Sequence, residues 1–401
     1  IIREIAPKLL GLPRNTSQHA SGVLLGRSPL VENIPTMFDG DTMKSQWPMN
    51  DVEAAGLLKI DVLSLNTLTL VRYINQLVKR KHPNFDINAV PFNDKKTFKL
   101  LSAGLTSGIF QLESDGITNV LKRYKPESLM DLALVLALYR PGPMGEIDSV
   151  VKKKHGKETV EYPLEELKSI LKDTYGVMIF QEQIMQVARK VAGYSLAEAD
   201  LMRRAMAKKN RETMMKEEEK FVTGGIKNGF DRDTLSSLFD LILKFADYGF
   251  PKSHALVYAM TSYRMAYLKT HYSEAFYAVM LMEHKTEEDK RTKTLGEMKQ
   301  LGIKLKRPSI NSSRFRNTID DGVQLGFGMI KSMSKRLGDA FVMNRSNEPY
   351  TDLYDFVTKN TELKPSETQL QMLILSGAMD DFKENRKTML QTVPRALEVI
   401  K

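Results

Sequence analysis

The chain has 401 residues, of which 42% are hydrophobic and 27% are charged, so it is long enough for two or three packed domains of a soluble protein. It contains no cysteine, which excludes disulfides and thiolate metal sites and fits a reducing cytoplasm, and no apolar run is long enough to span a bilayer. The net charge of +10 indicates a polyanionic partner, with nucleic acid favoured over a membrane surface; the alternative is a soluble protein that is merely basic.

The first 65 residues have the pattern of short strands and turns. Residues 1–5 resemble the middle of a helix, so we expect the chain to be a fragment of a longer protein. Val23–Leu25 is strand-like, and Phe38–Asp41 contains a glycine and two aspartates, which favour a tight turn. Leu57–Leu63 follows Gly56 and is rich in branched apolar residues, which predicts another strand.

Asp61 is a carboxylate inside this otherwise apolar strand. Lys59 is two residues away, so both side chains project from the same face. A carboxylate in such a strand costs free energy unless it is paired or holds a metal. Spacing alone leaves two alternatives open: an ion pair with Lys59 at the strand edge, or a metal-binding carboxylate beside a phosphate-binding lysine.

Helical periodicity begins at Thr67 and dominates the chain to about residue 300. An apolar stripe marks the first helix, and Leu129–Leu138 predicts a buried helix that Arg140–Pro143 ends. Further helix ends are predicted from capping residues: Ser195 with Glu198, Asn210, the pair Gly224–Gly225, Asp231 or Asp233, and Ser253 before a helix from His254 to about His271. Beyond Ile303 we expect short strands at Phe315–Ile319 and Val323–Phe327, with helices resuming from Lys331.

Three basic clusters are candidates for binding anions. Arg203, Arg204 and Lys208 lie close together on one helix, where guanidinium groups could grip a triphosphate or a strand backbone. The other two are Lys252, Ser253 and His254 at a helix start, and the loop-like run Lys152, Lys153 and Lys154. For each cluster the alternative is ordinary solvated charge or an ordinary helix cap.

Several common catalytic templates are missing. The sequence has no P-loop, no HExxH helix and no GxSxG elbow, and its six histidines show no ligand spacing. Two Asp-x-Asp pairs, at residues 39–41 and 231–233, fit turn and cap chemistry better than metal binding.

In this order the motifs resemble the family of bacterial DNA polymerase III alpha subunits of the DnaE type, which are C-family replicative polymerases. The resemblance covers essentially the whole chain. Its markers are Arg14–Asn15 with His19–Gly22, Gly56–Asp61, Phe110–Ser114, Arg140–Pro143, Gln181–Gln183, Arg203–Met206 and Tyr248–His254.

The resemblance implies an α+β fold that is mostly helical. Residues 1–12 would end the thumb, 13–65 would form the second half of the palm, and 66–305 would form the fingers. Residues 306–401 would begin the region that binds the duplex and the clamp, with a helix-hairpin-helix-like element. In that element Met329–Ser334 departs from the family, which has a glycine-containing hairpin there.

The resemblance also implies template-directed addition of deoxynucleotides to a primer 3′-end by a two-metal mechanism with Mg²⁺. Asp61 would be the metal-binding palm carboxylate and Lys59 would face the triphosphate. Arg203, Arg204 and Lys208, with Lys252, Ser253 and His254, would bind the incoming nucleotide. Arg140, Lys152, Lys153 and Lys154 would contact DNA.

The family's other two catalytic carboxylates are absent from this chain, so we expect the chain to be inactive alone. The implied partners are primer–template DNA, deoxynucleoside triphosphates and, for the whole subunit, the sliding clamp and other replisome subunits; no membrane partner is expected. One alternative is a non-enzymatic nucleic-acid-binding helical module. A weaker one is a metal-dependent phosphohydrolase using Asp61, which lacks the further ligands such a site requires.

Overall fold

The computed structural model describes residues 2–10, 17–19, 21–207, 211–246, 249–345 and 348–398. The chain divides into two compact units, unit 1 at Ile1–Thr69 and unit 2 at Leu70–Lys401. The fold is α+β and mostly helical, as the sequence predicts. Within the described ranges, no helix has both the length and the apolar character needed to cross a membrane.

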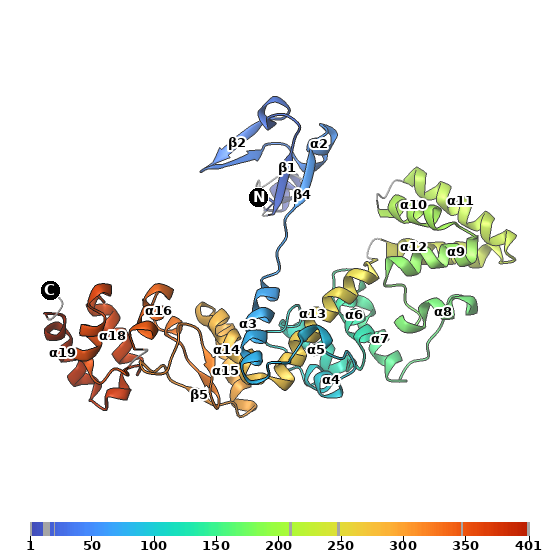
Figure 1. The fold of residues 1–401 in the computed structure, drawn as a ribbon. Helices are drawn as coiled ribbons and strands as arrows, with labels where there is room; N and C mark the ends of the chain where they lie inside the picture. The colour runs from blue at the N-terminus through green and yellow to red at the C-terminus, as the bar shows by residue number, and fades with distance from the viewer. Residues whose placement is uncertain are drawn as a thin grey trace. The chain divides into compact units, whose positions relative to one another are not determined.

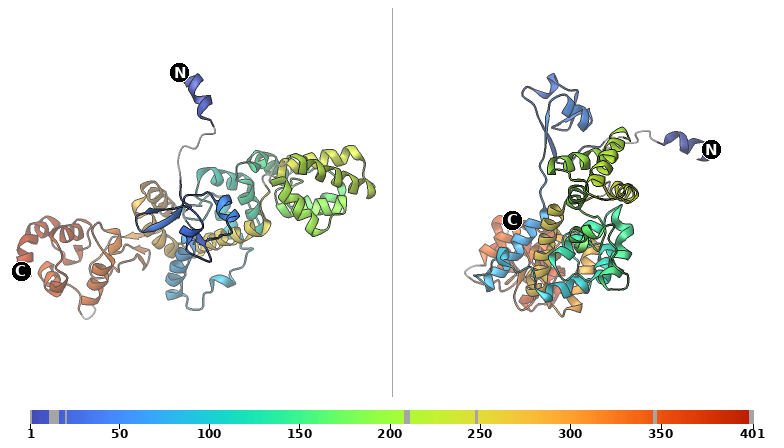
Figure 2. Two further views of the ribbon diagram at one scale, coloured as in Figure 1. Left: turned by 90° about the horizontal axis from the view of Figure 1, so that it is seen from above. Right: turned by 90° about the vertical axis from the view of Figure 1, so that its right-hand side faces the viewer.

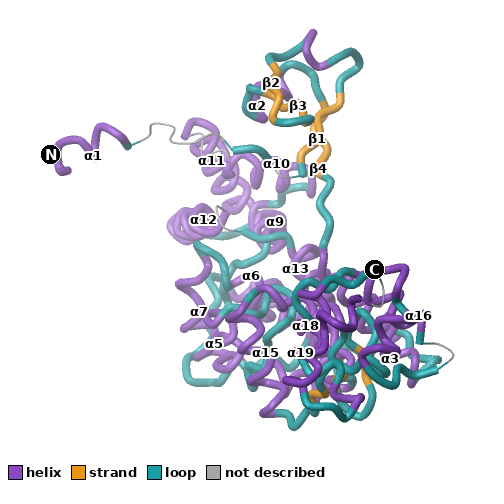
Figure 3. Tube along the Cα trace, turned by 90° about the vertical axis from the view of Figure 1, so that its left-hand side faces the viewer, coloured by secondary structure: helices purple, strands orange, loops and turns teal. Residues whose placement is uncertain are grey.

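Unit 1 contains two antiparallel pairs of short strands (Figure 3). Its elements are α1 (Ile2–Leu9), β1 (Gly22–Leu25), η1 (Leu30–Glu32), β2 (Thr36–Asp39), β3 (Thr42–Ser45), α2 (Met49–Ala54) and β4 (Leu58–Asp61), where η denotes a short 3₁₀-helix. Strand β1 pairs with β4, and β2 pairs with β3 across the predicted turn, where Gly40 has φ 58°. The strand predicted at Leu57–Leu63 is therefore present but shorter.

The core of unit 1 is small. Only Ile34, Val52 and Leu57 form a buried apolar cluster among its described residues. Apolar side chains of the β1–β4 pair stay exposed, including Leu58 at 61% and Val23 at 48%. An isolated two-stranded ribbon is marginally stable in water, so the β1–β4 pair has the character of an incomplete sheet.

Unit 2 is built almost entirely from helices (Figure 1). Helix α3 (Asn66–Lys81) begins in unit 1 and carries the predicted stripe, of which Ile74, Leu77 and Val78 are buried. The elements that follow are η2 (Ile87–Ala89), α4 (Lys95–Ser102), α5 (Asp115–Tyr124), α6 (Leu129–Leu138), η3 (Pro143–Glu146), α7 (Ile147–Lys154), η4 (Glu165–Leu167), α8 (Lys168–Leu171) and η5 (Lys172–Thr174).

A group of four helices follows and packs side by side (Figure 2): α9 (Gln181–Ala192), α10 (Leu196–Ala207), α11 (Arg211–Lys227) and α12 (Arg232–Ala246). The predicted capping box is confirmed, because the Ser195 N–H donates to Glu198 at 2.8 Å and the Glu198 N–H donates to the Ser195 hydroxyl at 3.2 Å. Asp231 is the predicted cap of α12 and accepts from the Thr234 N–H at 2.9 Å. The predicted cap Asn210 lies outside the described residues.

The prediction that Gly224–Gly225 ends a helix is wrong, because α11 continues to Lys227. Both glycines serve close packing instead. A Cβ atom at Gly224 would lie 2.3 Å from the carbonyl oxygen of Ala192, and one at Gly225 would lie 2.3 Å from Leu235 Cδ2. Without these glycines α11 could not approach α9 and α12 so closely.

Helix α13 (Lys252–His271) is the central element of unit 2 and packs along α6, whose residues Leu132–Leu138 are all buried. It is followed by α14 (Ser273–Glu283), η6 (His284–Thr286) and α15 (Glu288–Gln300). The predicted start of this helix is wrong: α13 begins at Lys252 with Pro251 at the N-cap, so Ser253 does not cap it.

The C-terminal part begins with a three-stranded sheet in the order β5–β7–β6. Its strands are β5 (Leu305–Lys306), which was not predicted, and β6 (Thr318–Ile319) and β7 (Val323–Gln324), which are shorter than predicted. The helices are η7 (Phe327–Met329), α16 (Lys335–Asn344), α17 (Leu353–Lys359), η8 (Thr361–Leu363), α18 (Glu367–Leu375), η9 (Asp380–Phe382) and α19 (Arg386–Glu398). They surround a second apolar core that includes Phe341 and Phe356.

The connection from η7 to α16 contains the Met329–Ser334 segment. Ser332 has φ 66°, a left-handed conformation that glycine adopts more readily. Ser334 caps α16 and accepts from the Leu337 N–H at 3.3 Å. Helices therefore resume at Lys335 and not at Lys331 as predicted, because four residues form this turn.

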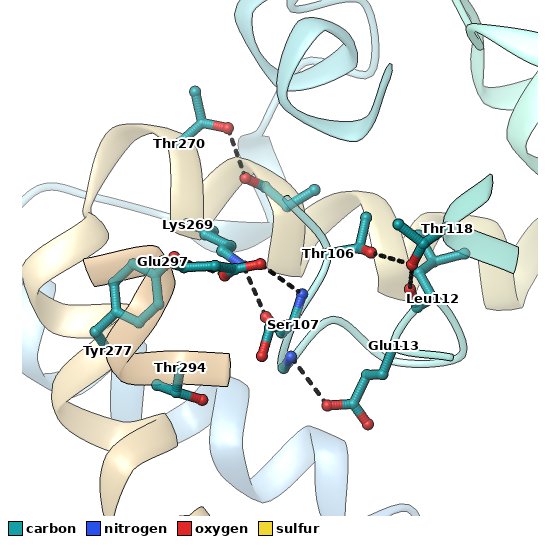
Figure 4. A network of polar contacts seen from close by, with 12 residues as sticks. Thr106, Ser107, Leu112, Glu113, Thr118, Lys269, Thr270, Tyr277, Thr294 and Glu297 are labelled. Atoms are coloured by element: carbon teal, nitrogen blue, oxygen red, sulfur yellow. Dashed lines mark hydrogen bonds and ion pairs between the residues drawn. The ribbon is translucent and has the colours of Figure 1, made fainter. Parts of the chain in front are cut away.

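A buried ion pair joins three of the central helices to the loop before α5 (Figure 4). Lys269 of α13 has no exposed side-chain surface and donates to Glu297 of α15 at 2.6 Å and to the Ser107 carbonyl at 2.7 Å. Glu297 also accepts from the Tyr277 hydroxyl of α14 at 2.9 Å. Burial lowers the pKa of Lys269 to about 8, while Glu297 opposes this shift.

The Gly224 contact gives a first prediction. Gly224→Ala should lower the free energy of unfolding by about 1–3 kcal/mol, because overpacking against Ala192 exceeds any gain in helix propensity. Gly296→Ala is the matched control, since Gly296 lies within α15 with open space around it, and it should raise stability by about 0.5–1 kcal/mol. Chemical denaturation measures both, and equal effects would contradict the packing argument.

The buried pair gives a second prediction. Lys269→Met should destabilise unit 2 by about 3–5 kcal/mol, because it leaves the Glu297 carboxylate buried without its partner. The double variant Lys269→Met/Glu297→Gln should recover part of this loss. Lys293→Met is the control, since its pair with Asp115 is exposed and should contribute less than about 1 kcal/mol. A double variant no more stable than the single one would argue against the ion pair as the cause.

Candidate nucleotide and metal site

In unit 1, Lys59 and Asp61 project from one face of β4 and form the ion pair that the sequence left as one alternative. Lys59 Nζ lies 3.0 Å from Asp61 Oδ1; the lysine side chain is 14% exposed and the aspartate 44%. Nearly half of the aspartate side-chain surface therefore remains open to solvent. Within the described ranges, no group of three or more His, Cys, Asp or Glu side chains could hold a metal ion.

His19 is a neighbour of Asp61 that the prediction of site residues missed. Its Nδ1 lies 3.8 Å from Asp61 Oδ1 and 3.3 Å from the Ser21 N–H. Gly22 makes room for this arrangement, because a Cβ atom there would lie 3.0 Å from Lys59 Cε and 3.1 Å from His19 Nδ1. The signal was present in the sequence, since His19 and Gly22 belong to the first marker motif.

In unit 2, Arg203 and Arg204 of α10 share a single carboxylate. Arg203 Nη2 lies 2.9 Å from Asp200 Oδ1, and Arg204 Nε lies 2.8 Å from Asp200 Oδ2. Hydrogen bonding from Arg203, aided by both positive charges, holds the pKa of Asp200 below its ordinary value. Two guanidinium groups against one carboxylate leave a net positive charge, and Arg204 is 66% exposed. The third predicted member, Lys208, lies outside the described residues.

The N-terminus of α13 is occupied by a carboxylate of the protein itself. The Lys252 N–H donates to both oxygens of Glu182, at 3.0 and 2.8 Å. An acidic side chain is favourable at this end of a helix. Glu182 was missed as a site residue, although it lies in the marker motif Gln181–Gln183. Ser253 and His254 are exposed in the first turn.

Arg140 lies beside this helix start, although the sequence assigned it to DNA contact. Its Cζ is 3.7 Å from the ring centre of Phe250, and His254 meets the same ring edge-on at 5.1 Å. His254 also stacks on Tyr258 at 4.1 Å. Burial lowers the pKa of Arg140 from its ordinary value. The structure therefore brings Arg140 together with the Lys252–His254 set through shared aromatic contacts.

The basic run Lys152–Lys154 was predicted to be loop-like, which is wrong, because these residues form the last turn of α7. Lys154 is only 8% exposed, lies 2.9 Å from Asp131 and sits over the Tyr124 ring. Lys153 is 14% exposed and 3.9 Å from Glu158. Lys152 alone in this run is exposed. Two of the three lysines are thus engaged within the fold.

Comparisons with known protein families match three parts of the chain. A model described as the bacterial DNA polymerase III alpha NTPase domain matches residues 1–64. The bacterial DNA polymerase III alpha subunit finger domain matches residues 67–229. A helix-hairpin-helix motif matches residues 302–389.

Curated relatives align along nearly the whole chain. The DNA polymerase III subunit alpha of Bacillus subtilis (strain 168) is 43% identical over 99% of the chain, which covers 36% of that protein. The subunit of that name from Staphylococcus epidermidis (strain RP62A) is 44% identical over 99% of the chain and 38% of the relative. The subunit of that name from Staphylococcus aureus (strain COL) is 44% identical over 98% of the chain, which covers 37% of that relative. The chain spans slightly more than a third of these relatives.

The Asp131–Lys154 pair gives a pH prediction. Burial alone would raise the pKa of Asp131, but hydrogen bonds from the Glu127 N–H, Lys154 and Tyr124 outweigh it and hold the pKa below its ordinary value. A depressed carboxyl pKa contributes stability that is present above the unfolded-state pKa and is lost as pH falls through the folded-state value. Asp131→Asn should therefore reduce stability at pH 7 and flatten its decline below about pH 4.

Acid titration of the free energy of unfolding measures this effect. Asp148→Asn is the control, since its partner Arg123 is exposed and the pair contributes little. An unchanged acid slope in Asp131→Asn would refute the assignment.

Proposed function

Because the chain belongs to the family of bacterial DNA polymerase III alpha subunits, we propose that it supplies part of the site with which the whole subunit extends a DNA primer on a template. The observation that carries this proposal is the alignment of 43–44% identity along 98–99% of the chain. The substrates in this proposal are deoxynucleoside triphosphates and primer–template DNA. For the whole subunit, the sliding clamp, other replisome subunits and a cytoplasmic location are part of the same proposal.

In the proposed reaction, residues 13–65 belong to the palm and Asp61 provides one oxygen ligand for a divalent metal. Carboxylate oxygens suit Mg²⁺, which prefers six ligands in octahedral geometry. Asp61 is 44% exposed and lies beside Lys59, and its carboxylate can supply only one or two of these ligands. It therefore fits a metal-binding role only together with other ligands. The other carboxylates would have to come from the part of the subunit outside this chain. A pair of such metals would activate the primer hydroxyl and stabilise the leaving group.

Lys59 would supply a positive charge to the triphosphate. Its ammonium lies 3.0 Å from Asp61 on a mostly buried side chain, so the charge is kept beside the carboxylate before any ligand arrives. A positive charge that is already near the site can stabilise a triphosphate once it binds, before the chemical step begins. We propose that Lys59 turns from Asp61 to the triphosphate when the carboxylate engages a metal.

The fingers, proposed as residues 66–305, would bind the nucleotide through α10 and α13. Arg204 is the exposed member of the pair on Asp200 and would contact phosphate oxygens, while Arg203 would be held by Asp200. Lys252 and His254 would flank the triphosphate, with Phe250 positioning His254 and Arg140. The proposed region from residue 306 would bind the duplex.

The site in unit 1 is tested in the whole subunit by single-turnover primer extension. Asp61→Asn should lower the rate by about 10²-fold or more, because a ligand that stabilises developing charge is lost. Asp39→Asn is the matched control, since Asp39 is another exposed aspartate of unit 1 paired with a lysine, Lys44, and it should keep the rate. The purified 401-residue chain should show no extension. Activity in the chain alone, or an equal loss in both variants, would contradict the proposal.

The role of α10 is tested by Arg204→Ala in the whole subunit. We expect the KM for the nucleotide to rise about tenfold, with primer–template affinity unchanged, because a charge-assisted hydrogen bond to phosphate is lost. Lys216→Ala on the neighbouring helix α11 is the control, since Lys216 is exposed and paired with Glu212. A helical module that binds only nucleic acid would instead show a smaller salt dependence of DNA binding in Arg204→Ala.

A further inference from the structure

One surface of unit 2 carries exposed arginines that pair with no acidic side chain among the described residues. Arg80 lies near the end of α3, and Arg314 and Arg316 lie in the segment before β6. The three side chains line a cavity of about 90 Å³, which we call the arginine pocket. None of them takes part in the ion pairs that the described residues form.

Neighbouring lysines behave differently, which makes the unpaired arginines informative. Lys81 next to Arg80 lies 3.7 Å from Glu274. Lys304 and Lys306, beside and on β5, lie 2.9 Å from Asp321 and 3.2 Å from Asp320. The acids of this surface therefore neutralise the lysines and leave the guanidinium groups with uncompensated positive charge.

The arginine pocket is held in place by its surroundings. Arg316 stacks over the Tyr73 ring with its Cζ 3.9 Å from the ring centre. Asn317, which follows Arg316 in the sequence and precedes β6, is buried. It donates to the Ala278 carbonyl at 2.9 Å and accepts from the Gly326 N–H at 2.8 Å. The Arg314 carbonyl accepts from the Phe327 N–H at 2.9 Å. The segment is thus fixed to α14 and η7, and the stacking on Tyr73 pre-organises the Arg316 guanidinium.

The size and chemistry of the pocket restrict its ligand. Pockets for whole small molecules begin at about 300 Å³, so a cavity of about 90 Å³ takes one small group of a larger ligand. Guanidinium forks match phosphate and carboxylate oxygens. The lining also includes the apolar side chains of Leu77, Val279 and Met282, which suit the face of a deoxyribose. Arg314 and Arg316 also fall in the segment that the helix-hairpin-helix model matches.

We infer that the arginine pocket binds the phosphate backbone of a DNA strand, with one phosphate in the cavity and the neighbouring phosphates against the exposed parts of Arg80, Arg314 and Arg316. This inference rests on the proposed function, since it takes DNA as the partner. It adds a binding site outside both the Asp61 site and the α10–α13 nucleotide site. The pocket contributes affinity and register on DNA without reading sequence, because phosphate contacts carry no base information.

The test is the salt dependence of DNA binding by the 401-residue chain, measured by fluorescence anisotropy with a primer–template duplex. Each phosphate contact contributes about 0.9 to the slope of log affinity against log salt concentration. Arg80→Gln/Arg314→Gln/Arg316→Gln should therefore reduce the slope by about 2 to 3. The control Lys81→Gln/Lys304→Gln/Lys306→Gln removes the same net charge from paired lysines on this surface and should reduce it by less than about 1.

A second variant separates binding from folding. Arg316→Gln removes the stacking on Tyr73, so Arg80→Gln/Arg314→Gln, which keeps that contact, should still reduce the slope by about 1 to 2. Equal slopes in the arginine and lysine triples would overturn the inference. A slope unchanged from wild type in both arginine variants would also overturn the inference. This holds even if the pocket then bound a polycarboxylate such as polyglutamate, because the inferred ligand is DNA. Absence of salt-dependent DNA binding by the wild-type chain would instead count against DNA as a partner in the proposed function.

Discussion

The buried ion pair between Lys269 and Glu297 is the constraint on which the arrangement of unit 2 most depends. It joins α13, α14 and α15 to the loop at Ser107, and its lysine has no exposed side-chain surface. Breaking such a pair leaves an uncompensated buried charge, which is far more costly than losing an exposed pair. Because α13 carries Lys252 and His254 at its other end, the same pair anchors the C-terminal part of the helix that presents them.

Three acids of the chain itself lie at the positive groups of the proposed active site. Lys59 pairs with Asp61, the arginines of α10 pair with Asp200, and the start of α13 donates to Glu182. Such partners position a charge before the ligand binds and leave part of it exposed. The arginine pocket is the contrasting case, because its guanidinium groups have no acidic partner in the described part of the chain. We therefore assign the pocket to a permanent polyanion, DNA.

Local features of the fold could be predicted from the sequence, and features set by distant contacts could not. The Ser195–Glu198 capping box involves neighbours three residues apart, so its pattern was sufficient. Gly224 was wrongly predicted to end a helix. A glycine is needed there because the helix packs closely against Ala192 of another helix, and such a distant contact leaves no local pattern. Asp200 lies three and four residues before its arginines and could have been found by helix spacing. Glu182 meets the backbone of a residue 70 positions away, which no local pattern reveals.

Asp61 pairs with Lys59 in this chain, and we expect it to exchange that partner for a metal in the whole subunit. Anomalous diffraction from crystals of the whole subunit with primer–template, nucleotide and Mn²⁺ would locate the metals relative to this carboxylate. We expect an anomalous peak at about 2.0–2.6 Å from an Asp61 oxygen, the range of oxygen ligands to hard divalent cations, with the Lys59 ammonium turned to the triphosphate. A structure in which Asp61 still pairs with Lys59 while the metals lie elsewhere would contradict the proposed role of this residue.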